Sequence, residues 1–103
     1  MRKIINNHKY DTDTAEVVAS DDNGFYQSNF RWMCETLYQK TNGEYFLHGE
    51  GGPASQYRIV YGDGHSYASG ARIIPLTEDE AKTWAQEHMS VGAYEEQFGP
   101  VEE

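Results

Sequence analysis

The sequence has few of the features that usually direct functional interpretation. It contains a single cysteine, Cys34, so an internal disulfide is excluded and the paired cysteines of a common zinc site are missing. No apolar run is long enough to cross a membrane, and no apolar segment follows the basic residues 2–3, so we expect no secretory signal. These absences favour a protein of the cytoplasm.

Positive charge is also scarce. The 103 residues include 8 Lys and Arg against 17 Asp and Glu, which gives a formal net charge of −9. Because nucleic-acid affinity comes largely from Lys and Arg displacing counterions, direct binding to nucleic acid is not expected, and the same holds for anionic membrane surfaces. Residues 78–103 hold eight of the acids and only one base, Lys82. This imbalance predicts either an acidic interaction surface or a solvated face that maintains solubility.

Motifs for catalysis or cofactors are weak. The glycine-rich run at residues 48–52 resembles the oxyanion strand of lipases only superficially, because no G-x-S-x-G nucleophile elbow is present. His48, Glu50, Asp63 and His65 lack the spacing of a metal site, and no phosphate-binding glycine motif occurs. A nucleophilic pair of Cys34 with a histidine is the remaining catalytic alternative. We therefore expect neither an enzyme nor a bound cofactor or metal.

Turn and strand signals dominate the first three quarters of the chain. Asn42 and Gly43 separate residues 30–39 from residues 44–48, which predicts a central β-hairpin. Apolar residues at the helical spacing i, i+3 and i+4 predict a short helix over residues 14–19. The remaining expectations are a hairpin turn at residues 6–7, a strand or short helix at 56–61, a strand at 71–76, and a positive φ at Gly51 or Gly52 after the central hairpin ends near residue 49.

The end of the chain has helix signals. Thr77 and Glu80 have the spacing of a capping box, and Ala81, Trp84 and Ala85 form an apolar stripe behind it. Ser90 can cap a second short helix whose core-facing residues would be Val91, Tyr94 and Phe98. We therefore predict one α+β domain over residues 1–103: a mainly antiparallel sheet of about four strands, with the central hairpin at 30–48, a short N-terminal helix and two C-terminal helices.

Four runs of the sequence are distinctive, namely residues 9–15, 35–38, 43–52 and 73–78, of which the glycine-containing third is the most specific. They resemble those of a group of short acidic proteins encoded mostly on phages and mobile elements of Gram-positive gut bacteria. The group is mainly uncharacterised and provides no catalytic residue. What the resemblance implies is a bacterial host cell and an anti-defence role, such as that of an anti-CRISPR or antirestriction inhibitor.

Charge and resemblance together lead to a binding hypothesis. An acidic surface can occupy the basic groove of a CRISPR effector or another nuclease and associates rapidly with it. The candidate partner-binding residues are Glu78, Asp79, Glu80, Glu87, Glu95 and Glu96. The alternative is a toxin-neutralising or other regulatory protein without nucleic-acid mimicry, which would use aromatic anchors, namely Phe25, Tyr26, Tyr57 and Tyr67.

Overall fold

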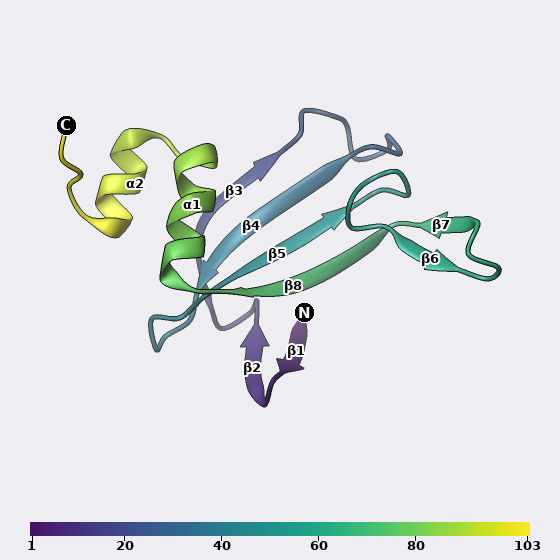
Figure 1. Ribbon diagram of the computed structural model, residues 1–103, viewed down its shortest axis with the longest axis horizontal. Helices are drawn as coiled ribbons and strands as arrows, with labels where there is room; N and C mark the ends of the chain where they lie inside the picture. Colours follow the sequence, from purple (N-terminus) through teal and green to yellow (C-terminus); the bar gives the residue numbers. More distant parts are fainter.

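The computed structural model describes all 103 residues and shows a mainly β protein (Figure 1). Strands make up 41% of the chain and helices 18%, with eight strands in three sheets and two helices at the C-terminus. The predicted α+β class, with one sheet of about four strands and an N-terminal helix, is therefore wrong. Residues 14–19 are not helical, and two additional two-stranded ribbons flank the main sheet.

The main sheet has four antiparallel strands in the order β3-β4-β5-β8. The predicted central hairpin is present as β4 (Met33–Gln39) and β5 (Tyr45–Gly51), with Gly43 at a φ of 91° in the turn. Its first arm begins at Met33 and not at residue 30, and its second arm continues to Gly51, although we expected the glycines from residue 49 onward to end it. The edge strands are β3 (Glu16–Asp22) and β8 (Gly70–Leu76), and Pro75 lies in the latter, where a missing N–H is tolerated.

A β-bulge explains why residues 14–19 gave a helical pattern. The register of β3 against β4 shifts between Val17 and Ala19, so Val18 is an extra residue in the strand. As a result Val18 and Ala19, although consecutive, both pack on the cluster beneath the C-terminal helices. This places apolar residues three and four positions after Ala15, which is the helical spacing, although the segment forms a strand.

One face of the sheet is covered in part by the N-terminal hairpin. Strands β1 (Arg2–Ile5) and β2 (His8–Asp11) are joined as predicted through Asn6 and Asn7, with φ values of 50° and 65°. The Tyr10 ring packs edge-on against the Phe46 ring, with 5.5 Å between their centroids. Tyr10, Phe46 and Ile73 form a buried cluster there.

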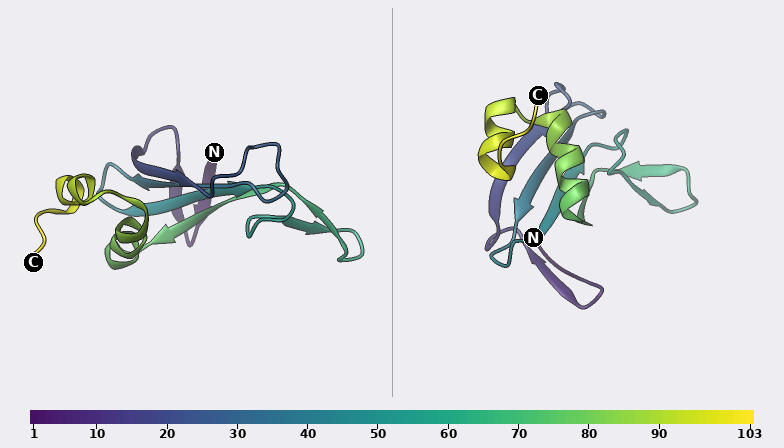
Figure 2. Two further views of the ribbon diagram at one scale, coloured as in Figure 1. Left: turned by 90° about the horizontal axis from the view of Figure 1, so that it is seen from above. Right: turned by 60° about the vertical axis from the view of Figure 1, so that its left-hand side comes forward.

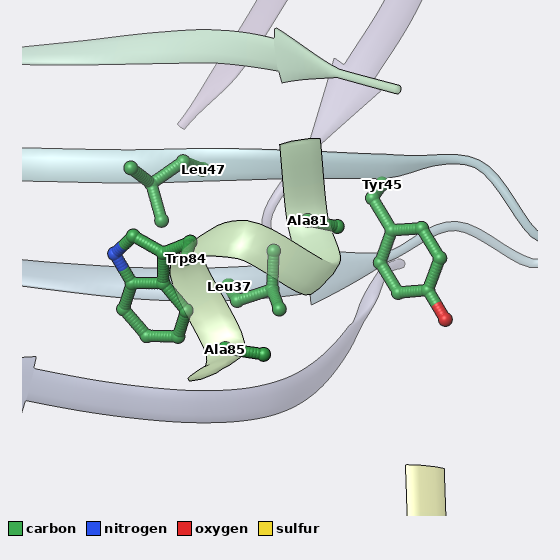
Figure 3. Packing of buried hydrophobic residues seen from close by; sticks show 6 residues of the cluster. All are labelled: Leu37, Tyr45, Leu47, Ala81, Trp84 and Ala85. Carbon is green, nitrogen blue, oxygen red and sulfur yellow. The ribbon is translucent and has the colours of Figure 1, made fainter. Parts of the chain in front are cut away.

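The C-terminal helices cover half of the opposite face. Helix α1 (Glu78–His88) directs its predicted stripe of Ala81, Trp84 and Ala85 onto Leu37 and Leu47 of the central strands (Figure 3). The capping box at its start is confirmed. Helix α2 (Val91–Phe98) begins after Ser90 as predicted and packs through Tyr94 and Phe98. Val91, which we expected in the core, is 76% exposed.

The third sheet is a small ribbon at the far end of the molecule. It consists of β6 (Ile59–Tyr61) and β7 (Ser66–Ala68), which pair in only three positions. The molecule measures 50 × 33 × 20 Å, and the ribbon and the helices lie at opposite ends of its long axis (Figures 1 and 2). The irregular residues 52–58 connect β5 to this ribbon and cover the half of the sheet face that the helices leave free.

Candidate functional site

Three of the six predicted partner-binding acids lie together in the first turn of α1. Glu80 accepts a hydrogen bond from the backbone N–H of Thr77 at 2.9 Å, so its carboxylate fixes the start of the helix. Glu78 is 3.7 Å from the ammonium group of Lys82 and is therefore partly neutralised. Asp79 is exposed and its side chain makes no hydrogen bond. The first turn thus presents one unpaired carboxylate and two that have contacts within the chain.

Glu87 lies at the other end of α1, beside an acid that sequence reasoning missed. His88 forms a contact of 2.7 Å between its Nδ1 and the carboxylate of Asp21 on β3. The Nε2 of the same ring is 4.0 Å from the carboxylate of Glu87. Asp21 belongs to a run of turn-forming residues in the sequence, so only strand pairing could show that it reaches the helix. The structure therefore adds Asp21 to the acidic surface next to Glu87.

The two acids of α2 differ in their environments. Glu95 is half-buried and accepts a hydrogen bond from the backbone N–H of Val101 at 3.1 Å, which ties the C-terminal tail to the helix. Glu96 is exposed and has no such partner. The six predicted residues are therefore spread over two helices and do not form one cluster. Asp79 and Glu96 are exposed and have neither a hydrogen bond nor an ion pair, whereas Glu78 and Glu87 are exposed and each lies beside a basic side chain.

The glycine-rich segment has a structural role. A Cβ atom on Gly49 would overlap the ring of Tyr57, and one on Gly51 would overlap Ser55. Neither Gly51 nor Gly52 has a positive φ, so that expectation is wrong. The glycines are required because residues 52–58 lie directly on the backbone of β5, and Gly52 in turn approaches the carbonyl of Phe30.

A buried carboxylate lies where the C-terminal helices and residues 52–58, which together cover one face of the main sheet, meet. Glu35 of β4 accepts hydrogen bonds from the hydroxyl of Tyr57, from the indole Nε1–H of Trp84 at 3.2 Å and from Gln56 at 3.3 Å. Burial of Tyr57, followed by its hydrogen bond to Glu35 and the charge of that carboxylate, raises the pKa of Tyr57. Both carboxylate oxygens of Glu35 have donors from this chain, so the residue connects α1, the loop and the sheet. Sequence reasoning missed it because its donors lie 21 to 49 positions away.

The candidate metal-binding residues do not form a metal site, and Cys34 shares a face of the sheet with His48 and Glu50 without a hydrogen bond to either. Cys34 lies 3.6 Å from the hydroxyl of Ser20, and the strand register places it opposite Glu50, while His48 is opposite Thr36. His65 is in the turn of the β6–β7 ribbon and thus on a different sheet. No group of three or more histidine, cysteine or acidic residues has an arrangement that could hold a metal ion.

The aromatic anchors of the alternative hypothesis also separate. Tyr57 is fully buried under its own chain and cannot contact a partner, which corrects that part of the hypothesis. Phe25 and Tyr26, in the connection between β3 and β4, and Tyr67, on β7, are exposed.

Comparison with known proteins provides no relative. No family model matches the chain, no curated protein is similar to it, and no solved structure matches its fold. Neither helix of the structure has the length and apolar character needed to cross a membrane.

Proposed function

We propose that the protein is a small acidic inhibitor that occupies the basic nucleic-acid-binding surface of a bacterial defence complex, such as a CRISPR effector or another nuclease. The observation that supports this proposal is the position of the negative charge. Residues 78–103 hold eight acids and one base, and they form the two helices at one end of the molecule together with the tail that follows them. The class of partner rests on the resemblance of the sequence to proteins of phages and mobile elements.

The spacing along α1 supports this proposal. Glu80 and Glu87 are seven positions apart, which places them on one side of the helix about 10 Å apart along its axis. One strand of DNA carries a charge about every 3.4 Å along the helix axis, so this separation corresponds to about three nucleotide steps. Asp79 and Asp21 lie near the two ends of the same helix and extend the negative surface.

The capping role of Glu80 determines which variant tests the proposal. Replacing Glu80 would weaken the helix start, so a loss of binding could come from a loss of folding. Asp79 and Glu87 make no hydrogen bond. Reversing Asp79 loses a favourable charge at the helix N-terminus, worth about 0.3–1 kcal/mol, and reversing Glu87 near the C-terminus gains a similar amount, so the double variant should stay folded. The double variant Asp79→Lys/Glu87→Lys is therefore the informative change.

The matched control is Asp13→Lys/Glu16→Lys, at two acids whose side chains make no hydrogen bond. It changes the net charge by the same amount at two exposed acids outside the helices. Two quantities are measured at low and at high salt. One is how strongly each variant prevents a purified RNA-guided nuclease complex from binding its target DNA, and the other is the rate at which each variant associates with that complex. We expect the helix variant to slow association at least tenfold at low salt, an effect that weakens as salt screens the charges, while the control retains inhibition. An equal loss of inhibition in both variants, or an association rate that does not depend on salt, would contradict the proposal.

A further inference from the structure

A pocket lies between the two C-terminal helices and the tail that follows them. Its apolar lining consists of Met89 at the end of α1, Val91 and Tyr94 on α2, and Val101 of the tail. The pocket has a volume of about 570 Å³, within the range of about 300–1,000 Å³ that is usual for ligand pockets. Val91 is 76% exposed and Val101 is 60% exposed, so this lining is open to the solvent. The pocket is therefore large and accessible enough to take an apolar side chain of another molecule.

Contacts at the end of α2 hold the tail beside the pocket. Gly99 follows the helix with a φ of 97°, a conformation that turns the chain and that glycine adopts without strain. The backbone N–H of Val101 then donates a hydrogen bond to the carboxylate of Glu95 at 3.1 Å. Tyr94 and Glu95 are three and four positions after Val91, so the three residues lie on one face of α2. The pocket is thus formed by the fold itself, between one face of a helix and a tail that is tied to that helix.

The charged side chains at the pocket are all acidic. Glu95, Glu102 and Glu103 line it, and no lysine or arginine does. An anionic occupant, such as a nucleic-acid phosphate or an anionic lipid, is therefore repelled. An apolar group flanked by positive charges fits both parts of the lining, because its apolar part is buried against the apolar side chains while its charges lie near the carboxylates.

We propose that this pocket takes an apolar side chain of the partner protein that is flanked by lysine or arginine residues. The inference rests on the proposed function, which places a protein surface rich in these residues against the same two helices. It adds an apolar anchor to the complementarity of charge. Exposed carboxylates act chiefly on the rate of association, whereas an apolar side chain buried at an interface acts chiefly on the rate of dissociation. The two contributions can therefore be measured separately.

The chain itself contains a segment of this chemistry, which defines a competing occupant. Ile4 in the N-terminal hairpin is 73% exposed and is paired with Lys9, and Arg2 lies two positions before it on the same face. If a second copy occupied the pocket through this hairpin, the NMR signals of the pocket would shift with the concentration of the protein alone, and Ile4→Ser would abolish the shift. That result overturns the proposal, and signals that do not depend on concentration support it.

A peptide titration tests the pocket without a nuclease. The probe is a short peptide, blocked at both ends, in which leucine lies between two pairs of lysines, and two comparison peptides replace the leucine with serine or the lysines with glutamates. We expect the first peptide to shift the amide signals of Val91, Tyr94 and Val101 in a saturable way, and both comparison peptides to bind at least tenfold more weakly. Equal binding of the leucine and serine peptides, or no saturable shift, overturns the proposal.

A matched pair of variants tests the anchor on the purified RNA-guided nuclease complex. Val91→Ser/Val101→Ser removes two exposed apolar side chains from the pocket and leaves every charge in place, and Val17→Ser/Val60→Ser makes the same change at two valines that are exposed elsewhere. We expect the pocket variant to dissociate at least tenfold faster than the wild type with an unchanged association rate, and the control to behave as the wild type. Circular dichroism checks that both are folded, and Val101→Ser alone, in the tail after the last helix, replaces the pocket variant if it is not.

The outcomes separate this inference from the proposed function. A wild type that inhibits the complex, together with a pocket variant that dissociates no faster, overturns the anchor and leaves the inhibitor proposal standing. A wild type that does not inhibit the complex contradicts the inhibitor proposal, and the peptide titration then decides whether the pocket takes an apolar side chain flanked by lysines.

Discussion

One face of the main sheet has two covers that pack by different means. Under α1 and α2, apolar side chains of the strands meet apolar side chains of the helices, as with Leu37, Leu47 and Trp84. Under residues 52–58, the strand presents Gly49 and Gly51, and the loop lies directly on its backbone. A helix leaves room for side chains from both layers, whereas a loop in backbone contact does not. The same strand, β5, therefore needs large residues at one end and glycines at the other.

The largest expected effect tests the helical half. Trp84→Ala should lower the free energy of unfolding by about 3–5 kcal/mol, because it empties a buried site and removes one donor to Glu35. Urea unfolding measures the change. Tyr26→Ala is the control at an exposed aromatic residue and should change stability by about 0.5 kcal/mol or less. A loss below about 1 kcal/mol for Trp84→Ala would contradict the packing of α1 on the sheet.

The next effect tests the loop half. Gly49→Ala should destabilise the fold by about 1–3 kcal/mol, because the added Cβ displaces the ring of the buried Tyr57. Gly92→Ala in α2 is the matched control, since a Cβ there meets nothing within 4 Å. The control should gain about 0.4–1 kcal/mol from the better helix propensity of alanine. Equal stability of both variants would show that residues 52–58 do not rest on β5.

The smallest effect at neutral pH tests the contact of Tyr57 with Glu35, where residues 52–58 meet helix α1. Tyr57→Phe removes the hydroxyl that donates to Glu35, and it should cost about 1–2 kcal/mol at pH 7. The pKa of Tyr57 is raised in the folded protein, so the neutral phenol favours folding. This contribution is fully present below the unfolded pKa of about 10 and is lost as the pH rises above it.

Urea unfolding between pH 8 and 11 measures that dependence. Above a pH of about 10, the wild-type protein should lose about 1.4 kcal/mol per pH unit more than the Tyr57→Phe variant. Tyr38, whose pKa is raised chiefly by burial, is present in both proteins and cancels from the difference. Parallel pH profiles for the two proteins would contradict the buried contact between Tyr57 and Glu35.

The sequence predicted how the C-terminal helices cover the sheet, but it did not predict how residues 52–58 cover the other half of the same face. The Thr77–Glu80 capping box and the stripe of Trp84 are patterns within a few residues, so they could be read directly. The helix expected over residues 14–19 was wrong because a bulge in β3 produces the same spacing of apolar residues. The glycines at 51 and 52 were linked to a positive φ, while their actual constraint is contact with Ser55 and Phe30, which no local pattern encodes.

Part of the candidate site could also be predicted from the sequence, and part could not. The excess of acids in residues 78–103 is a property of composition and follows from the sequence alone. Which carboxylates are exposed and unpaired does not, because Glu80 caps a helix, Glu95 holds the tail and Asp21 reaches His88 from a distant strand. The burial of Tyr57 was equally hidden.

The sequence by itself determined the charge, the turns at Asn6–Asn7 and at Gly43, and the starts of both helices, because these depend on neighbouring residues. Only the tertiary structure decided that the two ends of the long axis carry different elements, the acidic helices at one end and the β6–β7 ribbon with its exposed apolar side chains at the other. The physical reason is that strand pairing and burial join segments far apart in the chain. The exposure of a side chain therefore depends on partners that its neighbours in sequence do not specify.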